Sequence, residues 1–126
     1  MSISDWKRTI YALLALPAYL GGPEVRRRLA RRLLGAEPRR GGVAAGAAAF
    51  LVSLLVWYLV GRIATFGFFW SDADAAGSWG GPSLTGAWIV HFFCALGMTV
   101  PCMWLLRPLT RWQTRSPDQV VSSHQL

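Results

Sequence analysis

Residues 43–61, VAAGAAAFLVSLLVWYLVG, contain no Asp, Glu, Lys or Arg. At about 1.5 Å of rise per residue, a helix needs about 20 apolar residues to cross a hydrocarbon core of about 30 Å. A second stretch, residues 86–106, is also free of these four residue types. The two stretches therefore predict two membrane-spanning helices, and every other segment has to fit around them.

The basic residues flank these two stretches. The chain has 13 Lys and Arg against 6 Asp and Glu; nine of the basic residues precede Val43 and three follow Leu106. In a soluble protein this excess would suggest nucleic-acid binding. At the ends of membrane spans it instead predicts contact with anionic lipid headgroups, and no nucleic acid. Because no Lys or Arg lies between the spans after Arg62, the positive-inside rule places both termini in the cytoplasm.

The predicted fold is an all-α membrane protein, a two-helix transmembrane hairpin with an N-terminal basic amphipathic interfacial helix. Residues 1–42 form a cytoplasmic or interfacial segment. Residues 43–106 form the hairpin, with spans at about 43–66 and 86–106 and an external turn at 67–85. Residues 107–126 form a cytoplasmic tail whose last part is too polar to fold and is expected to be disordered.

Residues 10–20, IYALLALPAYL, are apolar but too short to span a membrane. With Lys7 and Arg8 in front they have the outline of a signal peptide. Cleavage there would leave an arginine-rich segment outside the cell, against the positive-inside rule. The stretch is therefore interpreted as an interfacial or re-entrant segment, and the sequence leaves these two alternatives open.

A basic amphipathic helix is predicted from Pro23 to its C-terminal cap at Gly35. Apolar residues recur at helical spacing at Val25, Leu29 and Leu33. The intervening positions carry the predicted lipid-binding residues Arg26, Arg27, Arg28, Arg31 and Arg32. Such a helix suits the headgroup plane, with its arginine stems along the acyl boundary. The alternative is that the arginines act only as a signal for membrane topology.

Small residues recur every fourth position in the first span, at Ala45, Ala49 and Ser53. Rows of this kind let two helix backbones approach closely inside a membrane. The row predicts contact with a membrane-protein partner or with a second copy of the chain.

Four titratable or charged side chains near the external turn are candidates for ligand binding or sensing. His91 lies inside the second span, where an ionisable group is a functional candidate by default. The alternative is a neutral His91 that donates to a backbone carbonyl or to Tyr58. Arg62, with Asp72 and Asp74, could form an external charge cluster for a charged ligand. The alternative there is an interfacial anchor beside solvated acids.

Soft side chains also gather along one face of the second span. His91, Cys94, Met98 and Cys102 fall within ~80° on a helical wheel, and such side chains bind copper or haem. Cys and Met are also ordinary fillers of apolar helices, and one helix alone cannot close a coordination sphere. These four residues are therefore weak metal candidates, and no metal or cofactor is predicted. The sequence lacks a nucleotide-binding loop, a nucleophile elbow and a zinc-ligand spacing, so no enzymatic activity is predicted.

Four segments together resemble motifs of a known protein family. They are residues 6–17 (WKRTIYALLALP), 31–35 (RRLLG), 79–88 (WGGPSLTGAW) and 105–109 (LLRPL). The set resembles the sensor-domain family of bacterial sensor histidine kinases and stand-alone membrane proteins. That family usually has four spans in two hairpins, whereas this sequence predicts one hairpin and no kinase core. The resemblance therefore implies a shortened, stand-alone relative in a bacterial cytoplasmic membrane, with no catalytic residues to carry over.

Two functions compete at this point. In the first, a sensor-like or regulatory module receives a signal at the external turn, where Trp79 and Trp88 lie, and the basic helix passes it to a partner. In the second, the chain is a small accessory subunit of a transporter or respiratory assembly. The resemblance favours the first function, and the row of small residues favours the second.

Overall fold

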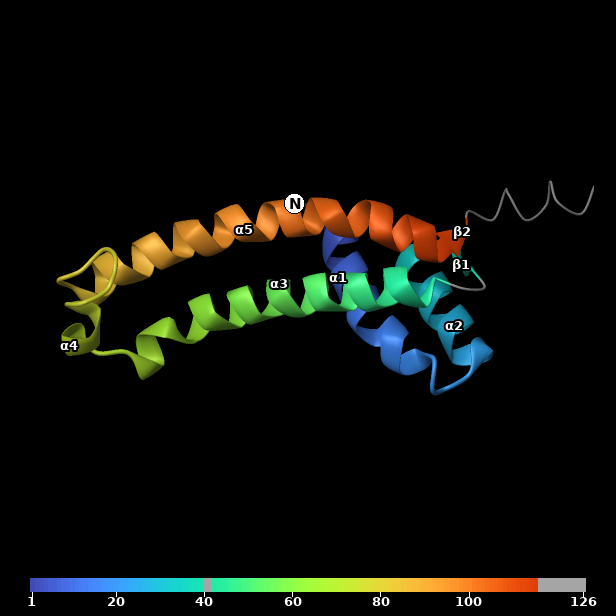
Figure 1. Ribbon diagram of the computed structural model, residues 1–126, viewed down its shortest axis with the longest axis horizontal. Coiled ribbons are helices and arrows are strands. Elements are labelled where there is room, and N and C mark those ends of the chain that lie inside the picture. Colours follow the sequence, from blue (N-terminus) through green and yellow to red (C-terminus); the bar gives the residue numbers. More distant parts are fainter. Residues whose placement is uncertain (40–41, 116–126) are drawn as a thin grey trace, which may run out of the picture. The chain divides into compact units, whose positions relative to one another are not determined.

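The computed structural model describes residues 1–39 and 42–115, and most of these residues are helical. Their elements are α1 (Ile3–Ala18), α2 (Pro23–Leu34), β1 (Glu37–Pro38), α3 (Val43–Phe69), α4 (Asp72–Ala75), α5 (Leu84–Gln113) and β2 (Thr114–Arg115) (Figure 1). Residues Val43–Phe66 and Leu84–Gln113 are long and apolar enough to cross a membrane. The disorder predicted for the end of the tail falls on residues outside the described part.

The chain divides into two compact units, which are described separately. The basic unit comprises residues Met1–Leu54 together with the chain from Cys102 onward. The turn unit comprises Leu55–Pro101. Both α3 and α5 contribute one part to each unit, and α5 continues without a break through Pro101 and ends at Gln113, beyond the predicted span.

Helix α1 contains the segment that the sequence left as interfacial or re-entrant. It begins with a capping box, in which the Ser2 hydroxyl accepts from the Asp5 N–H and the Asp5 carboxylate accepts from the Ser2 N–H. This reciprocal bonding satisfies backbone donors that a helix leaves free at its N-terminus. Residues 10–18 are thus the second half of a 16-residue helix.

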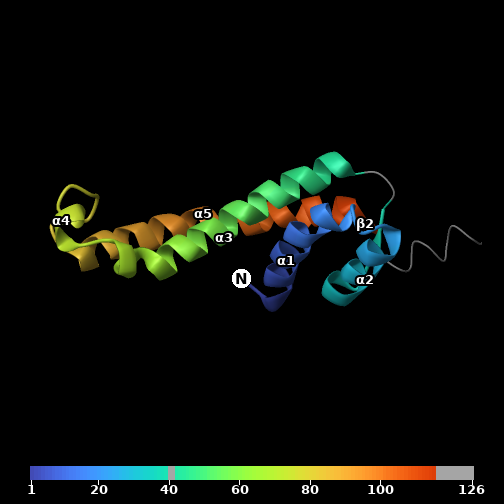
Figure 2. The same cartoon turned by 90° about the horizontal axis from the view of Figure 1, so that it is seen from below.

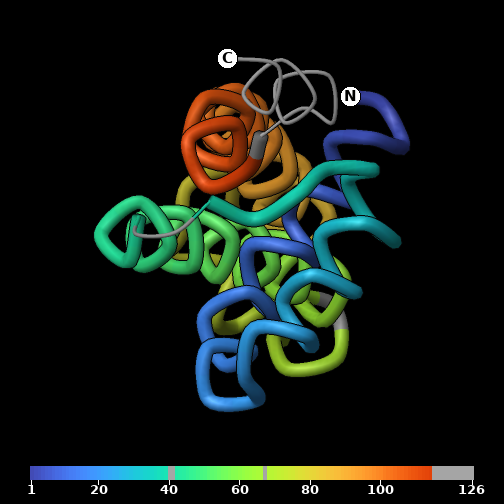
Figure 3. The backbone as a smooth tube through the Cα atoms, turned by 90° about the vertical axis from the view of Figure 1, so that its right-hand side faces the viewer, coloured from blue at the N-terminus to red at the C-terminus, as the bar shows by residue number. Residues whose placement is uncertain are grey.

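Helix α2 confirms the predicted helix and both of its ends. Pro23 occupies the first turn, and Gly35 ends the helix with a φ of 61°, the left-handed conformation that glycine adopts at low cost. Ala30 is completely buried against Tyr11 and Ala15 of α1, and leucines of α2 pack around them. The backbones of α1 and α2 lie side by side (Figure 3). The apolar face of α2 is therefore covered by α1, and the arginine face is the one that α2 presents outward.

Helix α1 also packs against the parts of α3 and α5 that belong to the basic unit (Figure 2). Ala12 belongs to one buried cluster with Ala49, Leu106 and Leu109. The Ser53 hydroxyl donates to the Thr9 carbonyl at 2.6 Å, in a buried position. Ala49 and Ser53 are fully buried, so these two residues of the small-residue row make a close helix contact with α1; contact of the row with a partner stays a prediction. Ala45, the first residue of the row, is half-buried.

A paired carboxylate and guanidinium join α1 to the last part of α5. Arg107 donates through Nε to Asp5 Oδ1 and through Nη2 to Asp5 Oδ2, both at 2.9 Å. Only 2% of the Asp5 side chain is exposed, and Arg8 adds a contact at 3.2 Å. These bonds from Arg107, then the Ser2 backbone bond, hold the pKa of Asp5 well below its ordinary value.

A pair of two-residue strands closes the basic unit. β1 and β2 are antiparallel, with Glu37 opposite Arg115 and Pro38 opposite Thr114. The Arg39 N–H extends the pairing by donating to the Gln113 carbonyl at 2.8 Å. The all-α prediction missed this pair because two residues cannot show a strand's alternating pattern.

The core of the turn unit lies where α3, α4 and α5 meet. Phe66, Ala75 and Ala87 form this core, with Trp70 and Leu84 packed against it. Helix α3 runs three residues beyond the predicted first span, and α4 occupies part of the predicted external turn. The turn that remains between α4 and α5 is therefore short.

We predict that Asp5→Asn lowers the free energy of unfolding by about 1–3 kcal/mol at neutral pH, because the charge-assisted bonds between the buried Asp5 carboxylate and the part-exposed Arg107 guanidinium are lost. The folded-state pKa of Asp5 lies below the ordinary 3.8. Its stabilisation is therefore complete well above that value and is lost progressively as the pH falls from there toward the lowered folded-state pKa, so the loss begins within the pH range of the measurement. Thermal unfolding of the purified chain in mild detergent, measured from pH 7 to pH 3, checks both effects.

The matched control is Glu24→Gln, which removes an exposed ion pair to Arg27 at 3.4 Å. This variant should lose less than about 1 kcal/mol and keep the pH dependence of the wild type. An Asp5→Asn variant with the wild-type acid dependence would contradict the role given to the Asp5–Arg107 pair.

Candidate functional site

The turn unit contains a pocket between its parts of α3 and α5. Its volume is about 160 Å³, and its lining is mostly apolar. The lining residues are Leu59, Arg62, Ile63, Phe66, His91, Cys94, Ala95 and Met98. Two of the predicted sensing residues, Arg62 and His91, therefore lie in the wall of one cavity.

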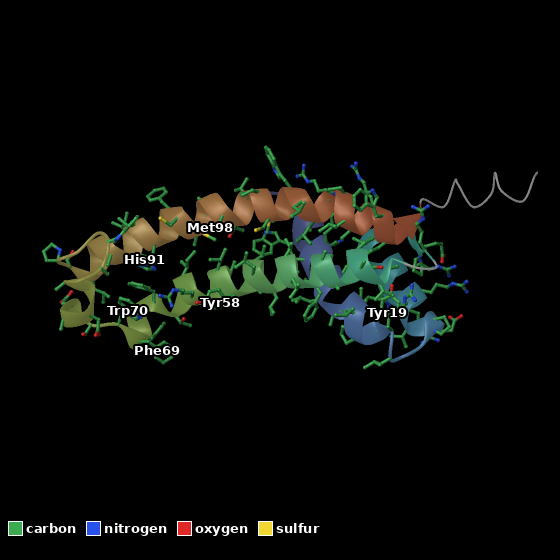
Figure 4. All side chains as sticks on the ribbon, in the orientation of Figure 1. Tyr19, Tyr58, Phe69, Trp70, His91 and Met98 are labelled. Atoms are coloured by element: carbon green, nitrogen blue, oxygen red, sulfur yellow. The ribbon has the colours of Figure 1, made fainter. Side chains whose placement is uncertain are left out.

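His91 is held in a fixed orientation on α5. Its Nδ1 lies 2.7 Å from the Ala87 carbonyl, and because a carbonyl can only accept, Nδ1 carries the hydrogen. The ring centroid is 5.0 Å from that of Phe66 and 6.3 Å from that of Trp70 (Figure 4). A backbone carbonyl is the partner expected in the alternative interpretation of His91, and the sensing role of this residue stays a prediction. No residue in the described part of the chain bonds Nε2.

The predicted cluster of Arg62, Asp72 and Asp74 does not form. Asp72 accepts from the Leu84 N–H at 2.8 Å and so binds the start of α5. Asp74 accepts from Ser71 in the capping box of α4, and these bonds lower the pKa of Asp74. Within residues 1–39 and 42–115, Arg62 has no carboxylate partner, and its guanidinium carbon lies 5.7 Å from the centre of the Trp70 ring.

The two predicted tryptophans have different surroundings. Trp88 is partly exposed and donates through Nε1 to the Ile63 carbonyl at 3.1 Å, which joins α5 to α3 within the turn unit. Trp79 is exposed over 82% of its surface. Trp88 therefore has a structural role, and Trp79 remains available at the surface.

The glycines of the WGGPSLTGAW run have a backbone role. Gly80 has a φ of 93°, which favours glycine. A Cβ added at Gly86 would collide with the Gly80 carbonyl. The two backbones therefore approach more closely than any residue with a side chain allows, and this explains part of the motif that carried the family resemblance.

The weak metal candidates are only partly brought together. His91, Cys94 and Met98 line the pocket, whereas Cys102 belongs to the basic unit. Among the described residues, no group of three or more His, Cys, Asp or Glu side chains is placed to hold a metal ion.

Three of the five predicted lipid-binding arginines have contacts within the chain. Arg26 lies 4.0 Å over the Tyr19 ring and donates to the Arg39 carbonyl. Arg27 and Arg31 both pair with Glu37. Arg28 and Arg32 are exposed, one turn apart on α2, and pair with no acid in the described residues. These two residues are the free cations of the helix.

Comparison of the chain with protein-family models, with curated proteins and with solved structures finds no match. The resemblance to the sensor-domain family therefore stays a prediction from the motifs.

We predict that Gly86→Ala destabilises the turn unit, because its Cβ would force the Gly80 backbone away. Gly97→Ala is the matched control in the same helix, since nothing lies within 4 Å of an added Cβ there. Gly97→Ala should be neutral or stabilising by up to about 1 kcal/mol. Thermal unfolding measures both, and equal stability of the two variants would contradict the close approach.

We also predict that Arg28→Gln with Arg32→Gln reduces the retention of anionic lipid on the purified chain. Arg27→Gln with Arg31→Gln changes the net charge equally but removes arginines that already pair with Glu37. Native mass spectrometry counts the lipids retained by each double variant. Equal losses in the two variants would show that only net charge matters.

Proposed function

We propose that the chain is a non-enzymatic integral membrane module with a sensor-like or regulatory role. In this proposal α3 and α5 span a bacterial cytoplasmic membrane as a hairpin, with both termini in the cytoplasm. The turn unit receives an external or bilayer signal, and the basic unit passes it to a partner protein or to anionic lipid.

The exposure of the two apolar helices supports the membrane part of the proposal. The most apolar windows of α3 and α5 have mean hydropathies of 2.2 and 1.9, yet only 28% and 22% of these windows are buried. Large side chains such as Leu51, Phe93 and Trp104 are about two-thirds exposed. Continuous apolar surface on this scale is unfavourable in water and suits contact with lipid.

The observation that carries the sensor-like role is the pocket of the turn unit. Arg62, which pairs with no carboxylate among the described residues, lines this mostly apolar pocket together with His91. Ionisable groups in a spanning segment are costly and mark functional sites. A bound ligand would supply a partner for the Arg62 guanidinium. It would also change the packing of α3 against α5 in this unit.

The row of small residues gives less support to the accessory-subunit alternative, because Ala49 and Ser53 of that row are buried within the chain. The exposed arginine face of α2 fits a lipid surface or an acidic partner equally well.

Affinity capture from native membranes in mild detergent, with the partners identified by mass spectrometry, tests the proposed role. We expect a signalling or regulatory protein in substoichiometric amounts, which Arg28→Gln with Arg32→Gln should reduce. Stoichiometric recovery of larger transporter or respiratory subunits would overturn the proposal and identify an accessory subunit. Release of the chain from membranes by alkaline carbonate would overturn the membrane placement.

A further inference from the structure

The described residues that line the pocket of the turn unit include one charged side chain, the exposed Arg62, and no Asp or Glu. Arg62 lies in the wall on α3, and His91 faces the cavity from α5. The acids nearest in sequence are engaged elsewhere, Asp72 at the start of α5 and Asp74 at the start of α4. Trp70 offers Arg62 a ring contact, which does not neutralise its charge.

The rest of the wall is apolar, and the cavity is small. Leu59, Phe66, Ala95 and Met98 supply aliphatic and aromatic surface. The volume of about 160 Å³ is close to that of engineered apolar cavities of about 150 Å³ that bind benzene. A ligand that fills this space therefore has an apolar body about the size of one aromatic ring.

Resting on the proposed function, we propose that the pocket binds a small amphipathic carboxylate whose apolar body is about the size of a benzene ring. The carboxylate accepts from the Arg62 guanidinium, whose fork of N–H donors matches it in a bidentate way. The apolar body lies against Phe66 and the fixed ring of His91 and contacts Ala95 and Met98. The signal of the proposed module is then the occupancy of this pocket by an organic acid.

Benzoate and benzamide form the matched pair of probes, because they share a shape and differ in charge. Titration of the full chain in nanodiscs of neutral lipid should show benzoate binding more tightly than benzamide. Arg62→Gln should weaken benzoate binding about tenfold or more and leave benzamide unchanged, since one charge-assisted contact is lost. Arg62→Lys should restore part of the preference.

Two controls locate the site. Arg111→Gln removes an exposed arginine of the basic unit and should leave benzoate binding unchanged. Met98→Trp places a bulky ring in the pocket wall and should weaken both probes. Equal binding of benzoate and benzamide by the wild type, or equal loss in Arg62→Gln and Arg111→Gln, would overturn the assignment.

Nanodiscs of anionic lipid distinguish a free acid from a lipid headgroup as the source of the anion. We expect benzoate to bind with similar affinity in both nanodiscs. Loss of benzoate binding in the anionic nanodiscs would overturn the free-acid assignment, because lipid then occupies Arg62. Absence of benzoate binding while the membrane capture still recovers a signalling partner would overturn the ligand class alone and leave the proposed function in place.

Discussion

The apolar surfaces of α3 and α5 constrain the rest of the structure. Both helices carry apolar side chains around most of their circumference, and the short helices α1, α2 and α4 are too small to cover them. In the basic unit, α1 therefore covers only one side of α3 and α5, through Ala12, Ala49 and Leu106. The buried Ser53 hydroxyl is bonded to the Thr9 carbonyl, as expected because an unpaired polar group in an apolar setting is costly. The side-chain amide of Gln113 is also buried in this unit, and it has no hydrogen-bond partner among the described residues.

The contacts of the few acidic residues explain which arginines have a carboxylate partner in the described part of the chain and which do not. The chain has 6 Asp and Glu, and three of them act at helix starts: Asp5 in α1, Asp72 at α5 and Asp74 in α4. Asp5 also neutralises Arg107, and Glu37 pairs with two arginines of α2. Asp72 and Asp74, the acids closest to Arg62 in sequence, thus bind helix starts, and among the described residues Arg62 pairs with no carboxylate.

Sequence patterns predicted the bounds of helices well, but they did not predict which groups pack against those helices. The helix from Pro23 to its cap at Gly35 follows from proline and glycine preferences and from apolar spacing, and all three act within a few residues. The same spacing could not tell whether lipid or protein would cover Leu29 and Leu33, because both are apolar. The structure places α1 there. Likewise, Arg62 and His91 were found as ionisable residues in apolar stretches, but their shared cavity was not.

The sequence by itself determined where the long helices lie, where α2 begins and ends, and which side chains are unusual in their setting. These properties follow from hydropathy, helix propensity and capping, which depend on neighbouring residues. The tertiary structure decided which distant groups meet: Asp5 with Arg107, Ser53 with Thr9, and Arg62 with His91 in one pocket wall. Such contacts depend on how segments that are distant in the sequence pack together. The spacing of apolar residues along one segment does not show which other segment it will contact.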